Sequence, residues 1–276
     1  MLKRNRLPRM TITLAMTCAC AALLPLAHAA RPRLDKLATT GTLDVCIWPE
    51  YYGISFRNQK SGTVAGLDVE MARELASQLG VRLNLVDSSF ARFIGDLENE
   101  RCDVAMMAVG ITAERSERLA FTTPYLRSDI HAVTMRNSSR IKRWEDIDRD
   151  GVRVGVTAGT YQEGLMSKRL RHADLVVVQA PASRESELEA GRIDVFMSDY
   201  PFTRKMIDNH DWVKIIDPPG AYFPVDYAYA LRKGDPAWLA RLDAFLARAR
   251  ADGTLRSIAT RYALDPIVID PRQRLP

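Results

Sequence analysis

The sequence predicts an α/β protein whose sheets are largely parallel. Short apolar runs of strand length alternate with helical patterns along most of the chain. Alternation of this kind is typical of sheets layered with helices. The strand-like runs cover residues 43–48, 81–86, 103–109, 152–156, 175–178, 193–197 and 213–216.

Two helices have clear boundary signals. In the first, an apolar residue recurs at every fourth position from Leu67 to Leu79, and Gly80 ends the helix. The second helix begins at Asp235, which is expected to be its N-cap, and Gly253 lies just beyond its end. Both helices are therefore predicted to pack one apolar face against a sheet.

The order of the elements suggests two halves of similar construction. A charged and polar stretch, residues 136–150, separates two strand–helix–strand blocks. One block precedes Arg127 and the other follows Val152. Residues 222–231 then alternate in an extended pattern and lead into the helix that Asp235 begins. This layout predicts two lobes with more than one crossing between them.

The first 29 residues have the pattern of a secretory signal peptide. Four basic residues precede a mostly apolar stretch, residues 12–26, and an Ala-His-Ala cleavage signal ends just before Ala30. The apolar stretch is too short to be a convincing membrane span, although a retained anchor is the alternative. Cleavage before Ala30 predicts a mature chain in the periplasm.

Removal of the signal peptide changes the charge balance. The whole chain has 39 basic and 34 acidic residues, and the signal peptide contains four of the basic ones and none of the acidic ones. The mature chain therefore has a formal net charge of only +1. This balance gives no reason to expect nucleic acid or a membrane surface as a partner.

Two cysteines remain after cleavage, Cys46 and Cys102. An isolated pair in an oxidising compartment favours a disulfide. Cys46 lies in the strand-like run 43–48, and Cys102 immediately precedes the run 103–109. If these strands are parallel neighbours, the two Cα atoms can meet the required separation of roughly 4.4–6.8 Å. The alternative is two unlinked buried thiols.

Several short motifs together resemble one protein family. Gly66-Leu67-Asp68-Val69, which opens a helix, resembles the Gly-Phe-Asp-(Val/Ile) signature of bacterial solute-binding family 3, the amino-acid-binding proteins of ABC importers. Further matches follow in the family's order and extend over nearly all of the mature chain. They cover residues 51–56, 101–104, 110–115, 154–160, 191–194, 232–236 and 252–255.

The resemblance implies a type II clamshell of the periplasmic-binding-protein kind, with two α/β lobes joined by two hinge strands. Such proteins close by a hinge motion around a ligand held between the lobes. The expected divisions are a first lobe of residues 34–127 plus 229–265, a second lobe of residues 131–224, hinge strands near 127–130 and 224–228, and a C-terminal tail of residues 266–276.

The resemblance also implies a carboxylate-binding site. Arg115, in a Thr-x-x-Arg motif, would hold the α-carboxylate of an amino acid through its planar guanidinium fork. By composition alone, Arg115 could equally be a surface arginine paired with Glu114 or Glu117. Thr160 and Tyr161 begin a helix, and its free N–H groups would receive the same carboxylate from the other lobe.

Asp199, just past a strand end, matches the aspartate that accepts the ligand's ammonium group in amino-acid binders. The alternative is an N-cap for a helix over residues 200–210, and one residue can serve both roles. Arg115 and Asp199 together would recognise a zwitterion, because each would meet the opposite charge.

The side-chain pocket departs from the family pattern. Trp48 stands where binders of basic amino acids have an acidic residue, and Tyr51 and Phe90 match aromatic residues that commonly sandwich a ligand. Met107, Ala108 and Gly110 stand where many relatives have Ser or Thr. These substitutions predict a neutral, apolar or aromatic ligand; the alternative is that Trp48 and Met107 simply belong to the core.

The resemblance implies a monomeric binding protein that serves an inner-membrane ABC permease and is not an enzyme. Two alternatives stay open. Some relatives are periplasmic cyclohexadienyl dehydratases, which act on prephenate or arogenate and need a carboxylic acid in the cleft. Glu163 could supply it, or could simply be a solvated residue favoured near a helix N-terminus. In its pair of cysteines the chain also resembles family-3-like binding modules that partner periplasmic quinoprotein dehydrogenases.

The mature chain has no sequence pattern for metal binding, nucleophilic catalysis or nucleotide binding. His131, His172 and His210 lack metal-ligand spacing, and neither a Gly-x-Ser-x-Gly elbow nor a P-loop occurs. A disulfide between the cysteines would also remove a thiolate nucleophile. We therefore expect no metal and no cofactor.

Overall fold

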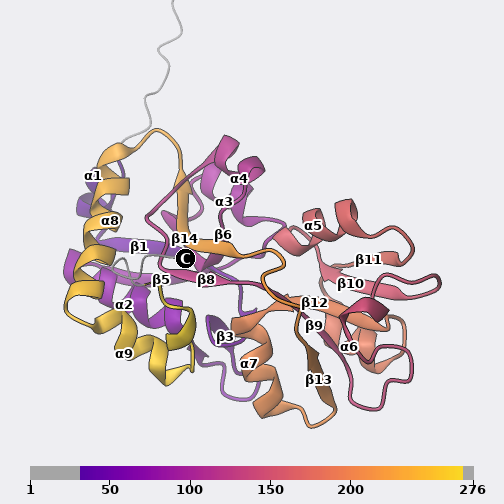
Figure 1. Ribbon diagram of the computed structural model, residues 1–276. Helices are drawn as coiled ribbons and strands as arrows, with labels where there is room; N and C mark the ends of the chain where they lie inside the picture. The colour runs from indigo at the N-terminus through magenta and orange to yellow at the C-terminus, as the bar shows by residue number, and fades with distance from the viewer. Residues whose placement is uncertain (1–31, 270–276) are drawn as a thin grey trace, which may run out of the picture. The chain divides into compact units, whose positions relative to one another are not determined.

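A computed structural model describes residues 32–269 of the chain. The predicted signal peptide and its cleavage site lie outside the described residues, as does the end of the predicted tail. Over the described part of the chain, no helix is both long and apolar enough to cross a membrane. Figure 1 shows two main sheets, with α5, α6 and α7 beside one of them and the remaining helices beside the other.

The first sheet has the strand order β5-β1-β6-β14-β7, and β8 also pairs with β14. Strand β1 is parallel to β5 and β6, whereas β14 runs antiparallel to its three neighbours. The strands are β1 (Thr42–Ile47), β5 (Arg82–Asp87), β6 (Val104–Gly110), β7 (Leu119–Phe121), β8 (Leu126–Ser128) and β14 (Val225–Arg232).

The second sheet repeats this plan with the order β11-β10-β12-β9-β13. Strand β10 is parallel to β11 and β12, and β9 is antiparallel to β12 and β13. A small third sheet joins β2, β3 and β4. Their bounds are β9 (Ile130–Met135), β10 (Arg153–Thr157), β11 (Asp174–Val178), β12 (Val195–Asp199), β13 (Val213–Ile216), β2 (Glu50–Tyr51), β3 (Ser55–Arg57) and β4 (Val64–Ala65).

Each predicted strand is present, with its ends within two residues of the expected positions. The two predicted helices are confirmed as well: Gly80 ends α2 in a left-handed conformation, and Asp235 caps α8 by accepting the N–H of Trp238 at 2.9 Å. The helices are α1 (Arg33–Thr40), α2 (Leu67–Leu79), α3 (Phe93–Glu98), α4 (Ala113–Arg118), α5 (Tyr161–Arg169), α6 (Arg184–Glu189), α7 (Tyr200–Asn209), α8 (Pro236–Ala251) and α9 (Thr254–Arg261), with short 3₁₀ turns at Trp144–Asp146 and Asp265–Ile267.

The chain crosses between the two sheets twice, from β8 to β9 and from β13 to β14. Arg127 and Asp226 face each other in the β8–β14 register, and two N–H···O contacts of 2.5 and 2.9 Å join them. The Asp129 carboxylate accepts the backbone N–H groups of Tyr222 and Phe223, both at 2.7 Å. The two crossings are therefore joined to each other by hydrogen bonds. The residue limits of the two lobes stay a prediction.

The segment after α9 returns to the first crossing. Leu264 is fully buried, Val268 forms an antiparallel bridge with Leu126 of β8, and the Ile269 N–H donates to the Tyr125 carbonyl at 3.1 Å. The first residues of the predicted tail therefore pack against a strand that leads into the second sheet.

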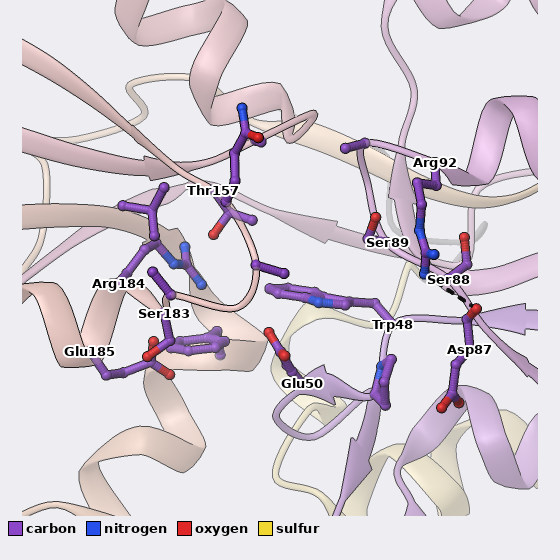
Figure 2. A pocket seen from close by; sticks show the side chains of 18 residues that line it. Trp48, Glu50, Asp87, Ser88, Ser89, Arg92, Thr157, Ser183, Arg184 and Glu185 are labelled. Carbon is purple, nitrogen blue, oxygen red and sulfur yellow. Dashed lines mark hydrogen bonds between the residues drawn. The ribbon is translucent and has the colours of Figure 1, made fainter.

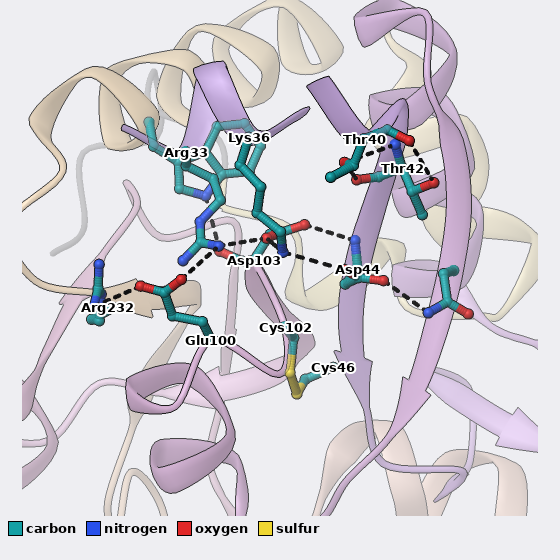
Figure 3. A network of polar contacts seen from close by, with 12 residues as sticks. Arg33, Lys36, Thr40, Thr42, Asp44, Cys46, Glu100, Cys102, Asp103 and Arg232 are labelled. Atoms are coloured by element: carbon teal, nitrogen blue, oxygen red, sulfur yellow. Dashed lines mark hydrogen bonds and ion pairs between the residues drawn. A yellow bond between two sulfur atoms is a disulfide. The ribbon is translucent and has the colours of Figure 1, made fainter. Parts of the chain in front are cut away.

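A disulfide joins Cys46 and Cys102, whose Cα atoms are 5.6 Å apart (Figure 3). It follows from the parallel pairing of β1 with β6, which sets Val45 opposite Val104. Since the bond closes a loop of 56 residues, it restricts the unfolded chain substantially.

A buried carboxylate next to this disulfide anchors the first helix. Asp103 accepts from the Arg33 guanidinium at 2.9 Å, from Lys36 Nζ at 2.8 Å and from the Asp44 N–H at 2.8 Å (Figure 3). The Arg33 side chain is itself only 6% exposed. The Asp103 carboxylate therefore fixes helix α1 to the sheet where β1 and β6 begin.

Replacing Asp103 by alanine should lower the free energy of unfolding by about 3 kcal/mol, because the buried Arg33 guanidinium would keep only the more distant Glu100 carboxylate at 3.9 Å. Urea denaturation monitored by circular dichroism measures the loss. Asp44→Ala is the matched control, since Asp44 also contacts Lys36 but is partly exposed, and it should cost less than about 1 kcal/mol. Equal losses in the two variants would contradict the anchoring role.

Candidate functional site

The loops that follow the parallel strands of both sheets meet around two adjoining cavities. In open α/β sheets, ligands commonly bind outside the carboxyl ends of the strands. The inner cavity has a volume of about 10 Å³ and the outer one about 530 Å³. The two adjoin because Trp48 and Arg184 line both of them.

Most of the predicted ligand-binding residues lie together at the inner cavity. Those lining it are Trp48, Tyr51, Phe90, Ala108, Thr160, Tyr161 and Asp199. Arg115 and Gly110 do not line it, but Arg115 packs against Phe90 and donates to the Gly110 carbonyl. The structure thus brings all the predicted residues into one region, while their role in binding stays a prediction.

Arg115 is a buried cation held between the two sheets. It donates to the Gly110 carbonyl at the end of β6 at 2.7 Å, and to the Gly159 carbonyl beyond β10 at 2.9 Å. Its guanidinium lies over the rings of Phe90 and Phe93, at 5.5 and 5.4 Å from their centres. Burial lowers its pKa to about 10, so it remains charged at neutral pH. No carboxylate of residues 32–269 lies in ion-pair contact with it.

The start of helix α5 lies beside Arg115. The N-cap residue Thr160 turns its hydroxyl to the Thr157 carbonyl at 2.7 Å and makes no side-chain cap on the helix. The N–H groups of the first turn therefore remain available to an anion. Gly159 is required here: a Cβ atom on it would lie 2.5 Å from the backbone of Phe90, and its φ is +75°.

Asp199 is buried at the end of β12, with 3% of its surface exposed. It accepts hydrogen bonds from the hydroxyls of Tyr51 and Tyr227, and at 3.3 Å from the N–H of Phe202. The helix-capping alternative is therefore correct, because Asp199 is the N-cap of α7. Burial raises the pKa of both tyrosines well above its usual value, so both hydroxyls stay protonated as donors.

The hydroxyl of Tyr161 has no hydrogen-bond partner among the described residues although it is buried. The Tyr227 hydroxyl is close enough to influence the pKa of Tyr161, yet no hydrogen bond of ordinary length and angle joins the two. Burial without a partner costs about 1–3 kcal/mol. The inner cavity is therefore lined by one residue with an unpaired hydroxyl, Tyr161, besides the Asp199 carboxylate.

The aromatic residues predicted to sandwich a ligand pack on one another. The ring centres of Trp48 and Phe90 are 5.5 Å apart in an edge-to-face arrangement, and Tyr51 lies 5.4 Å from Trp48 and 6.0 Å from Phe90. Trp48 is 8% exposed and belongs to the hydrophobic core as well as to the cavity wall. The core alternative for Trp48 is therefore confirmed, while its contact with a ligand stays a prediction.

The carboxylate of the Gly-Leu-Asp-Val motif supports the site from behind. Asp68 is fully buried and accepts from the Ala108 N–H at 2.7 Å and from the Tyr125 hydroxyl at 2.7 Å. Ala108 has a φ of +47°, a strained conformation for alanine, at an irregularity in the pairing of β6 with β14. Asp68 therefore holds the strained backbone that lines the inner cavity.

Three cavity residues and one neighbour were not anticipated from the sequence. Gln162, Arg184 and Ser198 line the inner cavity, and Tyr227 binds Asp199 from β14. Arg184 begins helix α6 in the loop after β11, so the rule on carboxyl ends of parallel strands could have indicated it. Nothing in the local sequence distinguishes the other three.

Glu163, considered above as a general acid, turns toward the backbone. Its carboxylate accepts the Gly159 N–H at 2.7 Å, and Glu163 lines neither cavity. Over residues 32–269, no group of three or more His, Cys, Asp or Glu side chains is arranged to hold a metal ion.

Comparison with known proteins gives consistent matches. The model of bacterial extracellular solute-binding proteins, family 3, matches residues 43–265. Cyclohexadienyl dehydratase of Pseudomonas aeruginosa is 30% identical over 253 residues, which is 91% of this chain and 94% of the relative. The L-cystine-binding protein TcyJ of Escherichia coli is 29% identical over 231 residues, 83% of this chain and 85% of that protein.

Solved structures agree with the fold. The arginine-binding protein ArgBP of T. maritima, as its P235GK mutant, superposes with a TM-score of 0.76 at 27% identity, covering 83% of this chain and 98% of its own. The ancestral amino-acid-binding protein AncCDT-1, described as a precursor of cyclohexadienyl dehydratase, also gives 0.76 at 27% identity, covering 83% and 99%. The predicted type II clamshell, with two α/β lobes joined by two hinge strands, is confirmed.

The support that Asp68 gives to Ala108 should make stability depend on pH. Burial raises the Asp68 pKa from 3.8 to about 7. Between these values the folded protein retains a proton that the unfolded chain has released, so the free energy of unfolding falls as the pH rises from about 4 to about 7. At about 1.4 kcal/mol per pKa unit, the fall is on the order of 2–4 kcal/mol. Urea denaturation at a series of pH values measures it.

Asp68→Asn should remove the part of the pH dependence of the unfolding free energy that comes from Asp68, because an amide does not titrate. The difference in unfolding free energy between wild type and variant then isolates Asp68 from other titrating groups. A difference that stays constant from pH 4 to pH 7.5 would contradict the raised pKa.

Proposed function

Because this chain belongs to family 3 of the bacterial extracellular solute-binding proteins, we propose that it captures a small amino-acid-like ligand in the cleft and delivers it to an inner-membrane ABC permease. Most of its named relatives are amino-acid-binding proteins, including histidine- and arginine-binding proteins of Escherichia coli. The periplasm is the proposed location, in keeping with the periplasmic histidine-binding relative and the predicted signal peptide.

The observation that carries this proposal is the buried charge of Arg115. A guanidinium with only carbonyl acceptors keeps donors that a carboxylate can take in two parallel bonds. The uncapped first turn of α5 lies next to it and adds further N–H donors. The α-carboxylate of an amino acid fits both features at once.

Asp199 supplies the complementary charge. Its present partners are two neutral hydroxyls and a backbone N–H, and no basic side chain of the described residues forms an ion pair with it. An ammonium group would give this carboxylate a donor that is itself charged, whereas all of its present donors are neutral. A zwitterion therefore neutralises both buried charges.

Binding also requires movement. A cavity of about 10 Å³ holds about one water molecule, so the cleft must widen to admit an amino acid. The two crossings, β8–β9 and β13–β14, are the segments about which the sheets can rotate. When the cleft is closed, the loop that contains Gly159 packs directly against the backbone of Phe90.

Arg115→Met should weaken binding of the cognate amino acid about 100-fold, because a charge-assisted pair with the carboxylate is lost while side-chain volume is kept. Protein refolded to remove carried-over ligand is screened by thermal unfolding against the amino acids, and hits are measured by calorimetry. Arg118→Met is the control, since Arg118 lies on the same helix, is exposed and pairs with Glu98. Unchanged affinity in Arg115→Met would refute the proposed site.

A second candidate function is that of a cyclohexadienyl dehydratase, because a relative of that name matches 91% of the chain at 30% identity. The reaction needs a carboxylic acid facing the substrate. Glu163 is committed to the Gly159 N–H, which disfavours that role. The binding function is therefore the better-supported one.

An assay of the purified mature protein separates the two functions. We expect no phenylpyruvate from prephenate and no phenylalanine from arogenate above the uncatalysed rate. Product formation above that rate would establish the enzyme instead, and its loss in Glu163→Gln would identify Glu163 as the acid.

A further inference from the structure

The outer cavity has a charge pattern that the proposed zwitterion site leaves unused. With about 530 Å³ it falls within the usual size range of small-molecule sites. Figure 2 shows side chains of both sheets around it, with Trp48 between Arg184 on one side and Arg92 on the other. The charged residues that line the outer cavity therefore bear on which amino acid binds.

Arg184 is a second buried cation without an anionic partner. Only 4% of it is exposed, and its guanidinium lies over the rings of Phe196 and Phe202, at 5.0 and 4.5 Å from their centres. One N–H donates to the Met197 carbonyl at 2.6 Å. Among residues 32–269 no carboxylate lies in ion-pair contact with it. Burial lowers its pKa, and the nearby charges of Glu185 and Asp199 offset only part of that lowering. A buried charge of this kind favours an anionic ligand group.

Two carboxylates line the same space, and one of them belongs to the chain neighbour of Arg184 (Figure 2). Glu50 comes from β2 and Glu185 from α6, and both line the outer cavity. Burial raises the pKa of Glu50, and the charge of Glu185 raises it further. Neither carboxylate forms an ion pair with a basic side chain of the described residues. A cation placed between them would relieve their repulsion.

We infer that the outer cavity is a second ligand subsite, in which Arg184 binds a carboxylate and the Glu50–Glu185 pair binds an ammonium group. The ligand class is an elongated amino acid with an ammonium–carboxylate pair at both ends. This inference rests on the proposed function, because the first end of the ligand occupies Arg115 and Asp199.

Simpler ligands satisfy only part of the charge pattern. An acidic side chain would meet Arg184 but would also face Glu50 and Glu185, whereas a basic side chain would leave Arg184 unpaired. The other charged residues of the cavity do not change the balance. Asp87 already has an ion pair with Arg57, and Arg92 is exposed to solvent.

Four thioether amino acids separate the contributions. L-Lanthionine carries the second ammonium and carboxylate, S-(2-carboxyethyl)-L-cysteine only the carboxylate, S-(2-aminoethyl)-L-cysteine only the ammonium, and S-ethyl-L-cysteine neither. We expect L-lanthionine, or L-cystine with a bridge one atom longer, to bind at least tenfold more tightly than the other three by calorimetry.

Arg184→Met should weaken L-lanthionine and the carboxyethyl probe about tenfold or more, while the aminoethyl and ethyl probes change less than about twofold. Arg92→Met, in the same cavity but exposed, is the matched control and should leave all four affinities unchanged. Circular dichroism and thermal unfolding check that the variants fold.

The outcomes distinguish the inference from the function on which it rests. Equal weakening of all four probes by Arg184→Met would show that Arg184 is structural and would overturn the second subsite. Tight binding of S-ethyl-L-cysteine that Arg115→Met abolishes, with no gain for L-lanthionine or L-cystine, would also overturn it and leave the proposed function standing. No binding of any probe or standard amino acid would overturn both.

Discussion

The guanidinium of Arg115 carries a full positive charge in a place from which water is largely excluded. Its pKa of about 10 keeps it charged at neutral pH, so the cost of its burial cannot be avoided by losing a proton. Carbonyls of Gly110 and Gly159 and the rings of Phe90 and Phe93 offset part of that cost. Because the Gly110 carbonyl ends β6 and the Gly159 carbonyl lies in the loop after β10, the same side chain that needs an anion also links the two halves of the cleft.

The fold places Arg115 and its neighbours at the cleft because its two sheets share one arrangement of strands. In each sheet, three parallel strands end toward the cleft beside an antiparallel strand, so that the residues after β1, β5 and β6 meet those after β10, β11 and β12. Close approach then depends on backbone detail. Asp68 holds Ala108 in a strained conformation, and Gly159 alone permits contact with the backbone of Phe90. Strain and buried charge are concentrated where a ligand would bind, as expected of a functional site.

The sequence predicts those parts of the structure that depend on local pattern. Strand runs, the cap at Asp235 and the disulfide follow from periodicity, capping chemistry and parallel pairing. Arg115 and Asp199 could be proposed only through their motifs, because an arginine among glutamates is ordinarily a surface residue.

The unanticipated residues depend on tertiary contacts. Arg184 lies in the charged run Arg-Glu-Ser-Glu, which by itself indicates a solvated helix turn. Its burial arises because Phe196 from β12 and Phe202 from α7 enclose its guanidinium. Tyr227 likewise occupies an ordinary strand position, and only the sheet order directs its hydroxyl to Asp199. Such placements are decided by how elements meet and leave no local signal.

The charges, rather than the aromatic walls, should decide which ligand is preferred. Apolar contact is worth about 25 cal/mol per Å², so an aromatic side chain gains a few kcal/mol by burial. Trp48, Tyr51 and Phe90 already obtain much of that contact from one another. A neutral ligand would leave Arg184 enclosed without an anion, and the effective desolvation penalty is several kcal/mol for each unpaired ion. The proposed second subsite therefore favours a ligand with a second charged end, and the apolar ligand expected from Trp48, Ala108 and Gly110 stays the competing prediction.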